Sequence, residues 1–306
     1  MGTGYLSINA RTYDEALPVA NAKVTIKETN GNVLYQTKTD ENGKTDYFPL
    51  QAPDVRYTLD PDYHKPAYAV YDVDVNAPGF ITEHIHNVEV VDTQSAYLPV
   101  EMKPMAIPAI ETDEDIYIPD IGLLSTEQNR KIAPFDIAAR AGLRPVIIPD
   151  YITVHLGRPT AAARNIRVRF SDYVKNVASS EIYSTWPTNS LIANIHAIVT
   201  FALNRVYTEW YRSRGYNFDI TNSTSFDMAY REGGPIFTNI SNIVDGIYNV
   251  YARRYGFENP FFTQFCNGST VTCPGLSQWG TVTLAKAGVT KNPLKNQIPY
   301  LNGIIA

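Results

Sequence analysis

Cysteine is scarce in this 306-residue sequence, which contains only Cys266 and Cys273. Two thiols are too few for a zinc site, which needs about four ligands. They could form a short local disulfide or stay free, and the disulfide is favoured if the protein works outside the cytosol. Among the five histidines, His84 and His86 are two apart and share one face of a strand, but no third ligand is evident. We therefore predict no metal and no other cofactor.

The sequence also lacks an excess of basic charge and any long hydrophobic run. With 26 basic and 31 acidic residues, its net charge is -5, which argues against a nucleic-acid partner. It has no basic membrane-binding stretch, and no segment approaches the length of a transmembrane helix. The first residues show neither a basic nor an apolar signal region, so no classical signal peptide is predicted. Nucleic acids and membranes are therefore not expected partners.

Aromatic and apolar residues, in contrast, are plentiful. Hydrophobic residues make up 44% of the chain and aromatic residues 12%, including 21 tyrosines. This composition is globular and is sufficient for buried cores in one to three domains. Tyrosine offers a flat apolar face with a polar tip, which suits contacts with sugars and with proteins.

Residues 1–103 are predicted to form a small β-sandwich. Short runs of alternating apolar residues recur along this segment, as in Leu6, Ile8 and Ala10. Asn30-Gly31 and Asn42-Gly43 separate such runs and are strong turn signals. Short strands at this spacing are typical of an all-β sandwich.

Residues 104–150 are predicted to be a proline-rich, acidic linker. Prolines and the acidic residues of 111–115 favour an extended, solvated chain, and only 134–144 has some helical pattern. Exposed linkers are preferred sites of proteolysis. We therefore expect an activating protease to be a possible partner that cuts here.

Residues 151–306 are predicted to form a second, α+β domain. Two strands lie near 151–156 and 166–170, and a helix capped by Ser171 or Asp172 leads to Glu181. Further helices are predicted over 188–214 and 235–255, both from apolar residues at helical spacing. A strand over 260–265 and a short helix ending at Gly288 complete this domain.

Glu181 lies between two predicted helices, close to Tyr183 and Trp186. From the residues alone, an exposed turn residue is the favoured interpretation, because most glutamates are solvated. Apolar neighbours would disfavour the charged form of the carboxyl group, as a general acid requires.

Two segments near the N-terminus resemble domains of the Cna-B and carboxypeptidase-regulatory type. They are residues 17–24, with the pattern P-x-x-x-A-x-V, and residues 37–44. The resemblance implies a β-sandwich and says almost nothing about function. Such domains act as stalks, inhibitors or docking modules.

Three blocks in the second domain, in order, resemble the SpoIID family of peptidoglycan lytic transglycosylases, in particular the clostridial spore cortex-lytic enzymes. Residues 173–187 have the pattern Y-V-x-x-V-x-x-x-E-x-x-x-x-W-P. Residues 202–207 are similar to A-x-x-R-T-Y, and residues 275–288 contain G-x-S-Q-x-G followed by A-x-x-G. The cysteine and histidine ligands of some family members have no match around 217–230.

The resemblance implies a SpoIID-like catalytic domain in which Glu181 is the sole acid and base. Its substrate would be the glycan strands of peptidoglycan, and its place the spore cortex or cell wall, outside the cytoplasm. The N-terminal region would correspond to a pro-region that restrains activity until proteolysis. Candidate substrate-binding residues are Tyr183, Trp186, Arg205, Tyr207, Gln264, Ser277, Gln278 and Trp279. For Trp279 a core role is an equally good interpretation.

Two other functions are compatible with the same residues. One is an inactive wall-binding or assembly protein, and the other is a hydrolytic muramidase or glucosaminidase. An ordinary glycosidase needs two carboxylates, whereas a lytic transglycosylase can use one. The single Glu181 therefore favours the transglycosylase.

Overall fold

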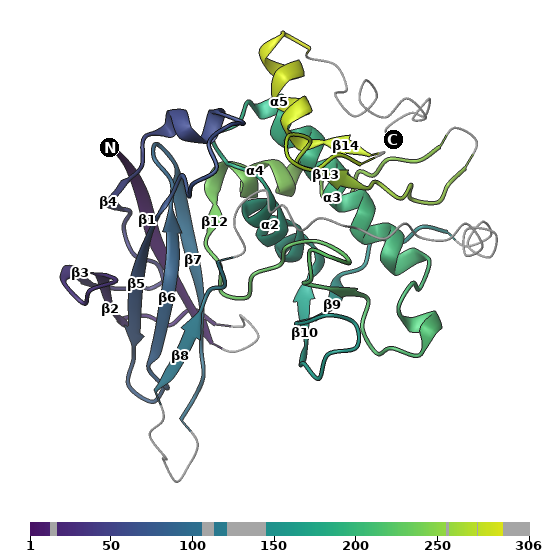
Figure 1. The fold of residues 1–306 in the computed structure, drawn as a ribbon. Helices are drawn as coiled ribbons and strands as arrows, with labels where there is room; N and C mark the ends of the chain where they lie inside the picture. Colours follow the sequence, from purple (N-terminus) through teal and green to yellow (C-terminus); the bar gives the residue numbers. More distant parts are fainter. Residues whose placement is uncertain (13–16, 106–112, 121–144, 255–256, 274, 290–306) are drawn as a thin grey trace. The chain divides into compact units, whose positions relative to one another are not determined.

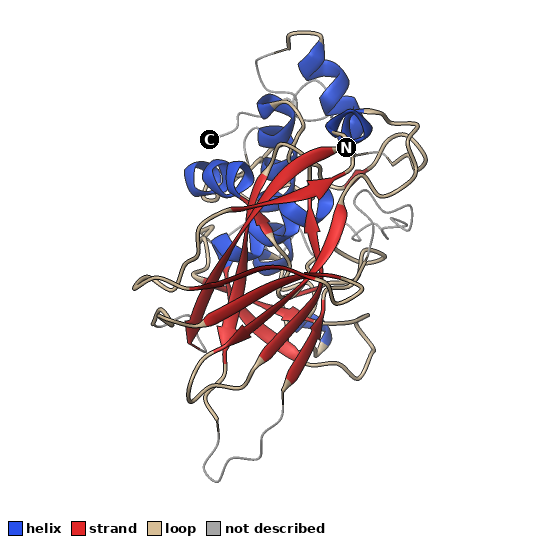
Figure 2. Cartoon of the chain, turned by 90° about the vertical axis from the view of Figure 1, so that its left-hand side faces the viewer, coloured by secondary structure: helices blue, strands red, loops and turns tan. Residues whose placement is uncertain are grey.

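The chain divides into two units, each of which joins segments that are discontinuous in the sequence. A computed structural model describes residues 1–12, 17–105, 113–120, 145–254, 257–273 and 275–289 (Figure 1). One unit comprises Met1–Asp120 and Arg231–Asn239, and the other Ile121–Tyr230 and Ile240–Ala306. Strands dominate the first unit, and most helices belong to the second (Figure 2).

The first unit contains two sheets that share a core, as predicted for a β-sandwich. One has the order β12-β7-β1-β4, and the other β3-β2-β5-β6-β8. Strand β6 contacts β1, β4 and β7 of the facing sheet, and alternate residues of both sheets are buried. The strands of the first sheet are β1 (Gly2–Thr12), β4 (Phe48–Ala52), β7 (Ser95–Met102) and β12 (Ile236–Phe237). Those of the second are β2 (Lys23–Glu28), β3 (Val33–Lys38), β5 (Ala69–Asn76), β6 (Glu83–Val90) and β8 (Glu114–Tyr117).

Two strands of this unit come from segments that we had not assigned to it. Strand β8 lies in the predicted linker 104–150 and pairs in parallel with β6, so the sandwich continues past residue 103. Strand β12 comes from the predicted second domain and pairs antiparallel with β7. The predicted boundary at 103 is therefore wrong for β8, and residues 231–239 of the predicted second domain belong to the first unit. The predicted helix over 134–144 lies outside the described residues.

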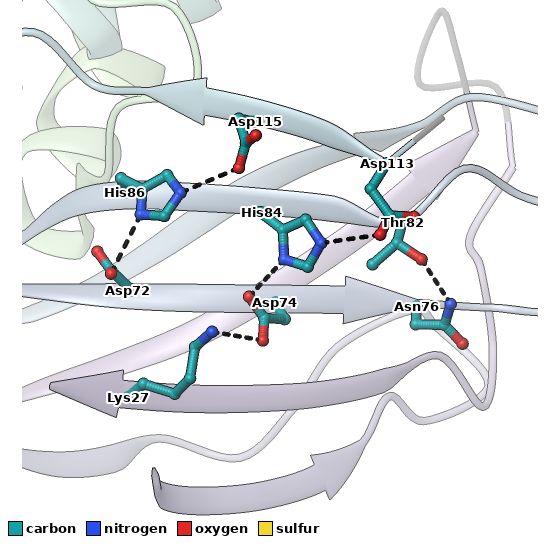
Figure 3. A network of polar contacts seen from close by, with 9 residues as sticks. All are labelled: Lys27, Asp72, Asp74, Asn76, Thr82, His84, His86, Asp113 and Asp115. Atoms are coloured by element: carbon teal, nitrogen blue, oxygen red, sulfur yellow. Dashed lines mark hydrogen bonds and ion pairs between the residues drawn. The ribbon is translucent and has the colours of Figure 1, made fainter. Parts of the chain in front are cut away.

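The acidic residues around β8 contact the two histidines of β6 (Figure 3). His84 lies 2.8 Å from Asp74 and 3.4 Å from Asp113. His86 lies 3.1 Å from Asp72 and 3.2 Å from Asp115. Asp113 and Asp115 of the predicted linker thus contact histidine side chains of the first unit. The two imidazoles face carboxylates on either side of their own strand.

The second unit combines small sheets with helices, which agrees with the predicted α+β class. Strand β9 pairs antiparallel with β10 and parallel with β11, and β13 pairs parallel with β14. These strands are β9 (Tyr151–His155), β10 (Asn165–Arg169), β11 (Ile220–Thr221), β13 (Phe265–Cys266) and β14 (Leu276–Ser277). The main helices of the described chain are α2 (Phe170–Glu181), α3 (Thr188–Tyr207), α4 (Thr238–Ile247) and α5 (Gln278–Lys286).

The helix boundaries differ from the sequence prediction at several ends. Helix α3 ends at Tyr207 rather than Arg214, because the Thr208 hydroxyl donates to the Asn204 carbonyl and Glu209 has a φ of 49°. Helix α4 begins at Thr238 rather than Pro235, since Ile236 and Phe237 belong to a strand. It ends at Ile247 rather than Tyr255.

Helix α2 begins at Phe170, one residue before the predicted cap. Asp172 lies in its first turn instead of capping it, and burial raises the pKa of this carboxyl group. The predicted strand over 260–265 is reduced to β13, which includes only Phe265 of that segment. No helix of the described chain is long and apolar enough to cross a membrane.

Candidate functional site

Glu181 is the last residue of α2 and is only 2% exposed. The apolar stripe of this helix, including Tyr173, Val174 and Val177, is fully buried and holds the helix in the core of the second unit. The side-chain oxygen Oε1 of Glu181 accepts a 2.8 Å hydrogen bond from the backbone N–H of Ala229. The interpretation of Glu181 as an exposed turn residue is therefore wrong. It is a buried carboxyl group with a fixed orientation.

A tight turn connects Glu181 to the next helix. The N–H of Ile182 donates to the Ala178 carbonyl at 3.2 Å, and that of Trp186 to the Tyr183 carbonyl at 3.1 Å. The Pro187 carbonyl then accepts hydrogen bonds from the first turn of α3. Proline is well suited to the start of a helix because its φ is already helical. The turn thereby fixes the positions of Tyr183 and Trp186.

The aromatic residues near Glu181 pack against one another. The rings of Trp186 and Trp279 are 4.9 Å apart at 52°, and those of Tyr183 and Trp186 are 6.3 Å apart, edge to face. Trp186 is 3% exposed and Trp279 is 9% exposed. Such pairs stabilise a core beyond the area that they bury. The structure thus brings Trp279 against Trp186, which lies far from it in the sequence.

Helix α5 contributes polar residues at the same end of α2. The Ser277 hydroxyl caps this helix by accepting from the N–H of Gly280 at 3.0 Å. The side-chain amide of Gln278 is fully buried and donates to the Glu181 backbone carbonyl at 3.3 Å. The motif from Gly275 to Gly280 is therefore in direct contact with Glu181.

A second polar group joins α5 to α3. The hydroxyl groups of Ser190 and Thr281 lie 2.5 Å apart, and the Asn194 amide donates to Thr281 at 2.9 Å. All three side chains are buried. These buried contacts hold the start of α5 against α3.

Two glycines near α5 are required by close approach. The N–H of Leu276 donates to the Gln264 carbonyl, and a Cβ atom on Gly275 would lie 1.9 Å from that oxygen. Gly268 has a φ of +79°, and a Cβ atom there would lie 1.8 Å from the Ser277 hydroxyl. Gln264 therefore contacts the motif through its backbone.

The same loop contains a disulfide between Cys266 and Cys273, whose Cα atoms are 6.1 Å apart. It closes the loop that separates β13 from β14. The sequence left this pairing open against two free thiols. The structure has the disulfide.

Arg205 belongs to a buried ion pair. It is 2% exposed, its Nε atom donates to Asp227 at 2.8 Å, and its Nη2 atom donates to the Phe226 carbonyl at 3.2 Å. The second oxygen of Asp227 accepts from the Tyr211 hydroxyl at 2.6 Å and from both the N–H and the hydroxyl of Thr221. Burial, followed by the charge of Asp227, raises the pKa of the Tyr211 hydroxyl. Asp227 is two residues before Ala229, whose N–H binds Glu181. Through its ion pair with Asp227, Arg205 therefore helps to hold this loop in place.

Tyr207, the remaining candidate, is the last residue of α3 and is half-buried. The sequence did not identify Ala229, since a backbone donor leaves no side-chain signal. The Asp227 carboxylate, two residues before Ala229, is fully buried. The Arg205–Asp227 pair is separated in the sequence and has no motif of its own.

A cavity of about 530 Å³ lies elsewhere in the second unit, and Glu181 does not line it. Its lining residues are Ile148, Pro149, Asp150, Tyr151, Arg169, Phe170, Ser171, Tyr248 and Asn249. Within the described ranges there is no group of three or more histidine, cysteine or acidic residues that could hold a metal ion.

Comparisons with known proteins give no family assignment. No protein-family model matches the chain, and a search of curated proteins finds no match. Solved structures match about a third of it.

The Bacillus anthracis TIE protein matches with 20% identity and a TM-score of 0.25, over 34% of this chain and 18% of its own. Klebsiella pneumoniae 5-hydroxyisourate hydrolase matches with 17% identity and a TM-score of 0.23. The match covers 35% of this chain and 93% of the hydrolase chain. The minor pilin GBS52 of Streptococcus agalactiae matches with 13% identity and a TM-score of 0.25. The match covers 36% of this chain and 48% of the pilin chain. The chain thus spans less than half of the TIE protein and of the pilin. These TM-scores are too low to support a conclusion about the function of this chain.

Proposed function

We propose that the protein is a peptidoglycan lytic transglycosylase that uses Glu181 as its only acid and base. The observation that carries this proposal is the buried Glu181 carboxyl group, which accepts a hydrogen bond from the Ala229 N–H, while Gln278 donates to the Glu181 backbone carbonyl. Glu181 and Gln278 come from the blocks that resemble the SpoIID family. The substrate would be the glycan strands of spore cortex or cell-wall peptidoglycan, outside the cytoplasm.

The hydrogen bond to Oε1 indicates which oxygen of the Glu181 carboxyl group would carry the transferable proton. In a protonated carboxyl group, the oxygen that accepts an N–H is the carbonyl oxygen, so the transferable proton would be on Oε2. Glu181 would give this proton to the glycosidic oxygen as the bond from C1 of N-acetylmuramic acid to N-acetylglucosamine breaks. The C6 hydroxyl oxygen then bonds to C1, and its proton returns to Glu181. The products are a 1,6-anhydromuramic end and a free N-acetylglucosamine 4-hydroxyl.

Replacement of Glu181 tests the catalytic role. The change Glu181→Gln keeps the side-chain size and an oxygen for the Ala229 N–H but removes the transferable proton. We expect it to reduce solubilisation of spore cortex about 100- to 10,000-fold, as for loss of general acid catalysis. The control is Glu258→Gln, since this carboxylate is exposed and belongs to the same unit.

Thermal unfolding of both variants shows whether the fold is intact. Equal solubilisation by Glu181→Gln and the unchanged protein would exclude the catalytic assignment. If neither protein solubilises cortex but both bind it, the wall-binding alternative holds. Mass spectrometry of the products separates the remaining alternative, because a muramidase or glucosaminidase gives reducing ends instead of 1,6-anhydro ends.

We further propose that the N-terminal region restrains this activity until a protease cuts the chain. Residues of β8 are hydrogen-bonded in a sheet, which protects backbone from proteases, so the cut would lie outside Glu114–Tyr117. The proposal predicts that protein cut between residues 120 and 145 digests cortex faster than intact protein. Equal rates for both forms would contradict the restraint.

A further inference from the structure

The segment Arg231–Asn239 belongs to the first unit although the rest of its neighbourhood in the sequence belongs to the second. Its strand β12 extends the first sheet at β7, with Ile236 opposite Tyr97 and Phe237 opposite Ala96. Without it, β7 would be the edge of that sheet. Adding a strand to an exposed edge is a common way for proteins to bind an extended peptide.

Side chains within strand β12 and directly after it also hold the segment in place. Ile236 is 5% exposed and Phe237 is 1% exposed, so both apolar side chains are buried. Beyond the strand, the hydroxyl groups of Thr238 and Tyr47 lie 3.2 Å apart. Neighbouring strand residues point to opposite faces of a sheet, so Phe237, opposite the buried Ala96, is the apolar anchor on the core side. Backbone pairing and a buried anchor are elements of a specific peptide-binding site.

The strongest contact is a buried ion pair between Arg231 and Glu89. The two guanidinium nitrogens each donate to a different carboxylate oxygen, Nη2 to Oε2 at 2.9 Å and Nη1 to Oε1. Arg231 is 1% exposed and Glu89 is 2% exposed. Bidentate pairs of this kind are geometrically specific, and removing one partner leaves a buried charge uncompensated.

We propose that the first unit holds residues 231–239 as a captured edge strand, which keeps the two pieces of the chain joined after a cut between residues 120 and 145. A cut in that range separates the covalent chain into a piece with β1 to β8 and a piece with β12. The captured strand stays in its sheet because its pairing with β7 and the Arg231–Glu89 ion pair lie within the first unit. Removal of the N-terminal piece then requires the release of β12 as a second event. This inference does not depend on the reaction that the second unit catalyses.

The test uses the full chain with an N-terminal affinity tag and a specific protease site placed between residues 120 and 145. After complete cleavage under native conditions, we expect the C-terminal piece to stay on the affinity resin with the tagged piece. Arg231→Ala is expected to weaken this association at least about 100-fold, as is Glu89→Ala, because each leaves its partner buried and unpaired. Arg253→Ala is the matched control, since Arg253 pairs with Glu258 outside the first unit.

A competition experiment covers the case in which these variants fold poorly. An excess of a synthetic peptide with the sequence of residues 231–239 should release the C-terminal piece from the unmodified, cleaved protein. The same peptide with Arg231→Ala should not. Separation of the unmodified pieces on cleavage alone would overturn the proposal. So would an association that neither the substitutions nor the peptide weakens.

Discussion

Two buried carboxylates, one in each unit, have opposite surroundings. Asp227 in the second unit accepts hydrogen bonds from Arg205, Tyr211 and Thr221. Glu83 in the first unit is also fully buried, but burial and the nearby charge of Glu114 raise its pKa to about 7. Hydrogen-bond donors surround the Asp227 carboxylate, whereas the surroundings of Glu83 favour a neutral acid. Burial alone therefore does not determine the charge of an acidic side chain, because the number of donors around it decides.

The largest expected effect comes from breaking the Asp227 site. Asp227→Asn removes the charge that compensates buried Arg205, so we expect the second unit to lose roughly 3–5 kcal/mol of unfolding free energy. The three tryptophans of the chain, Trp186, Trp210 and Trp279, all lie in this unit. Urea titration followed by tryptophan fluorescence therefore measures it selectively.

The matched control is again Glu258→Gln, where an exposed ion pair is lost at a cost of less than about 1 kcal/mol. A loss of similar size in both variants would show that the Asp227 site is not a charge-specific one. In the Asp227→Asn variant, Ala229 should be held less firmly in place. The hydrogen bond from its N–H to Glu181 should weaken as a result.

Replacement of Glu83 should stabilise the protein, whereas replacement of Asp227 should destabilise it. The pKa of its carboxyl group is about 7 in the folded protein and 4.5 in its unperturbed state. The folded state thus binds more protons between these values, and stability falls as the pH rises from 4.5 to 7. The non-ionising change Glu83→Gln should remove this slope and stabilise the first unit at pH 8 by up to roughly 3 kcal/mol.

The measurement is urea unfolding at pH 4, 6 and 8, followed by far-UV circular dichroism at a wavelength dominated by sheet. The variant should gain little at pH 4, where Glu83 is protonated in both states. Identical pH slopes for the variant and the unchanged protein would mean that Glu83 is not neutral in the folded state.

The smallest effect concerns the histidines that face β8. The hydrogen bond to Asp74, and then that to Asp113, raise the pKa of His84. The pKa of Asp74 is lowered, because contacts with Lys27 and His84 together outweigh burial. The stabilisation from protonated His84 is complete below its unfolded pKa of about 6.5 and is lost as the pH rises through the folded value.

We therefore expect His84→Gln to reduce the stability of the first unit by about 1 kcal/mol or less at pH 5.5, and by almost nothing at pH 8.5. His64→Gln is the control, since His64 is exposed. Histidine NMR titrations at each site give the direct comparison. An effect of His84→Gln that is independent of pH would contradict the ion-pair explanation.

The sequence predicted those elements whose signal is local. Alternating residues such as Leu6, Ile8 and Ala10 identified strands of the first unit, and apolar residues at helical spacing identified α2 and α3. The two-residue strands β12 and β14 were not predicted, because partners distant in the sequence fix them. For example, Ile236 is extended since it pairs with Tyr97.

The same distinction holds for the candidate site. The position of Glu181 at the end of a helix was predictable from the pattern around it, but its burial was not. Its hydrogen bond from Ala229 depends on a loop whose own position depends on the pairing of Asp227 with Arg205. No periodicity connects these residues, so only the folded chain shows them together.

The membership of β12 in the first sheet also has a consequence for synthesis on the ribosome. Strand β7 ends at Met102, whereas β12 begins at Ile236, so β7 emerges long before its partner. At the usual speed of translation the interval is on the order of ten seconds. During this time the edge of the nascent sheet is open to other chains. A chaperone that covers β7 until β12 emerges would favour correct assembly over aggregation, whereas slower elongation would lengthen the exposure of this edge.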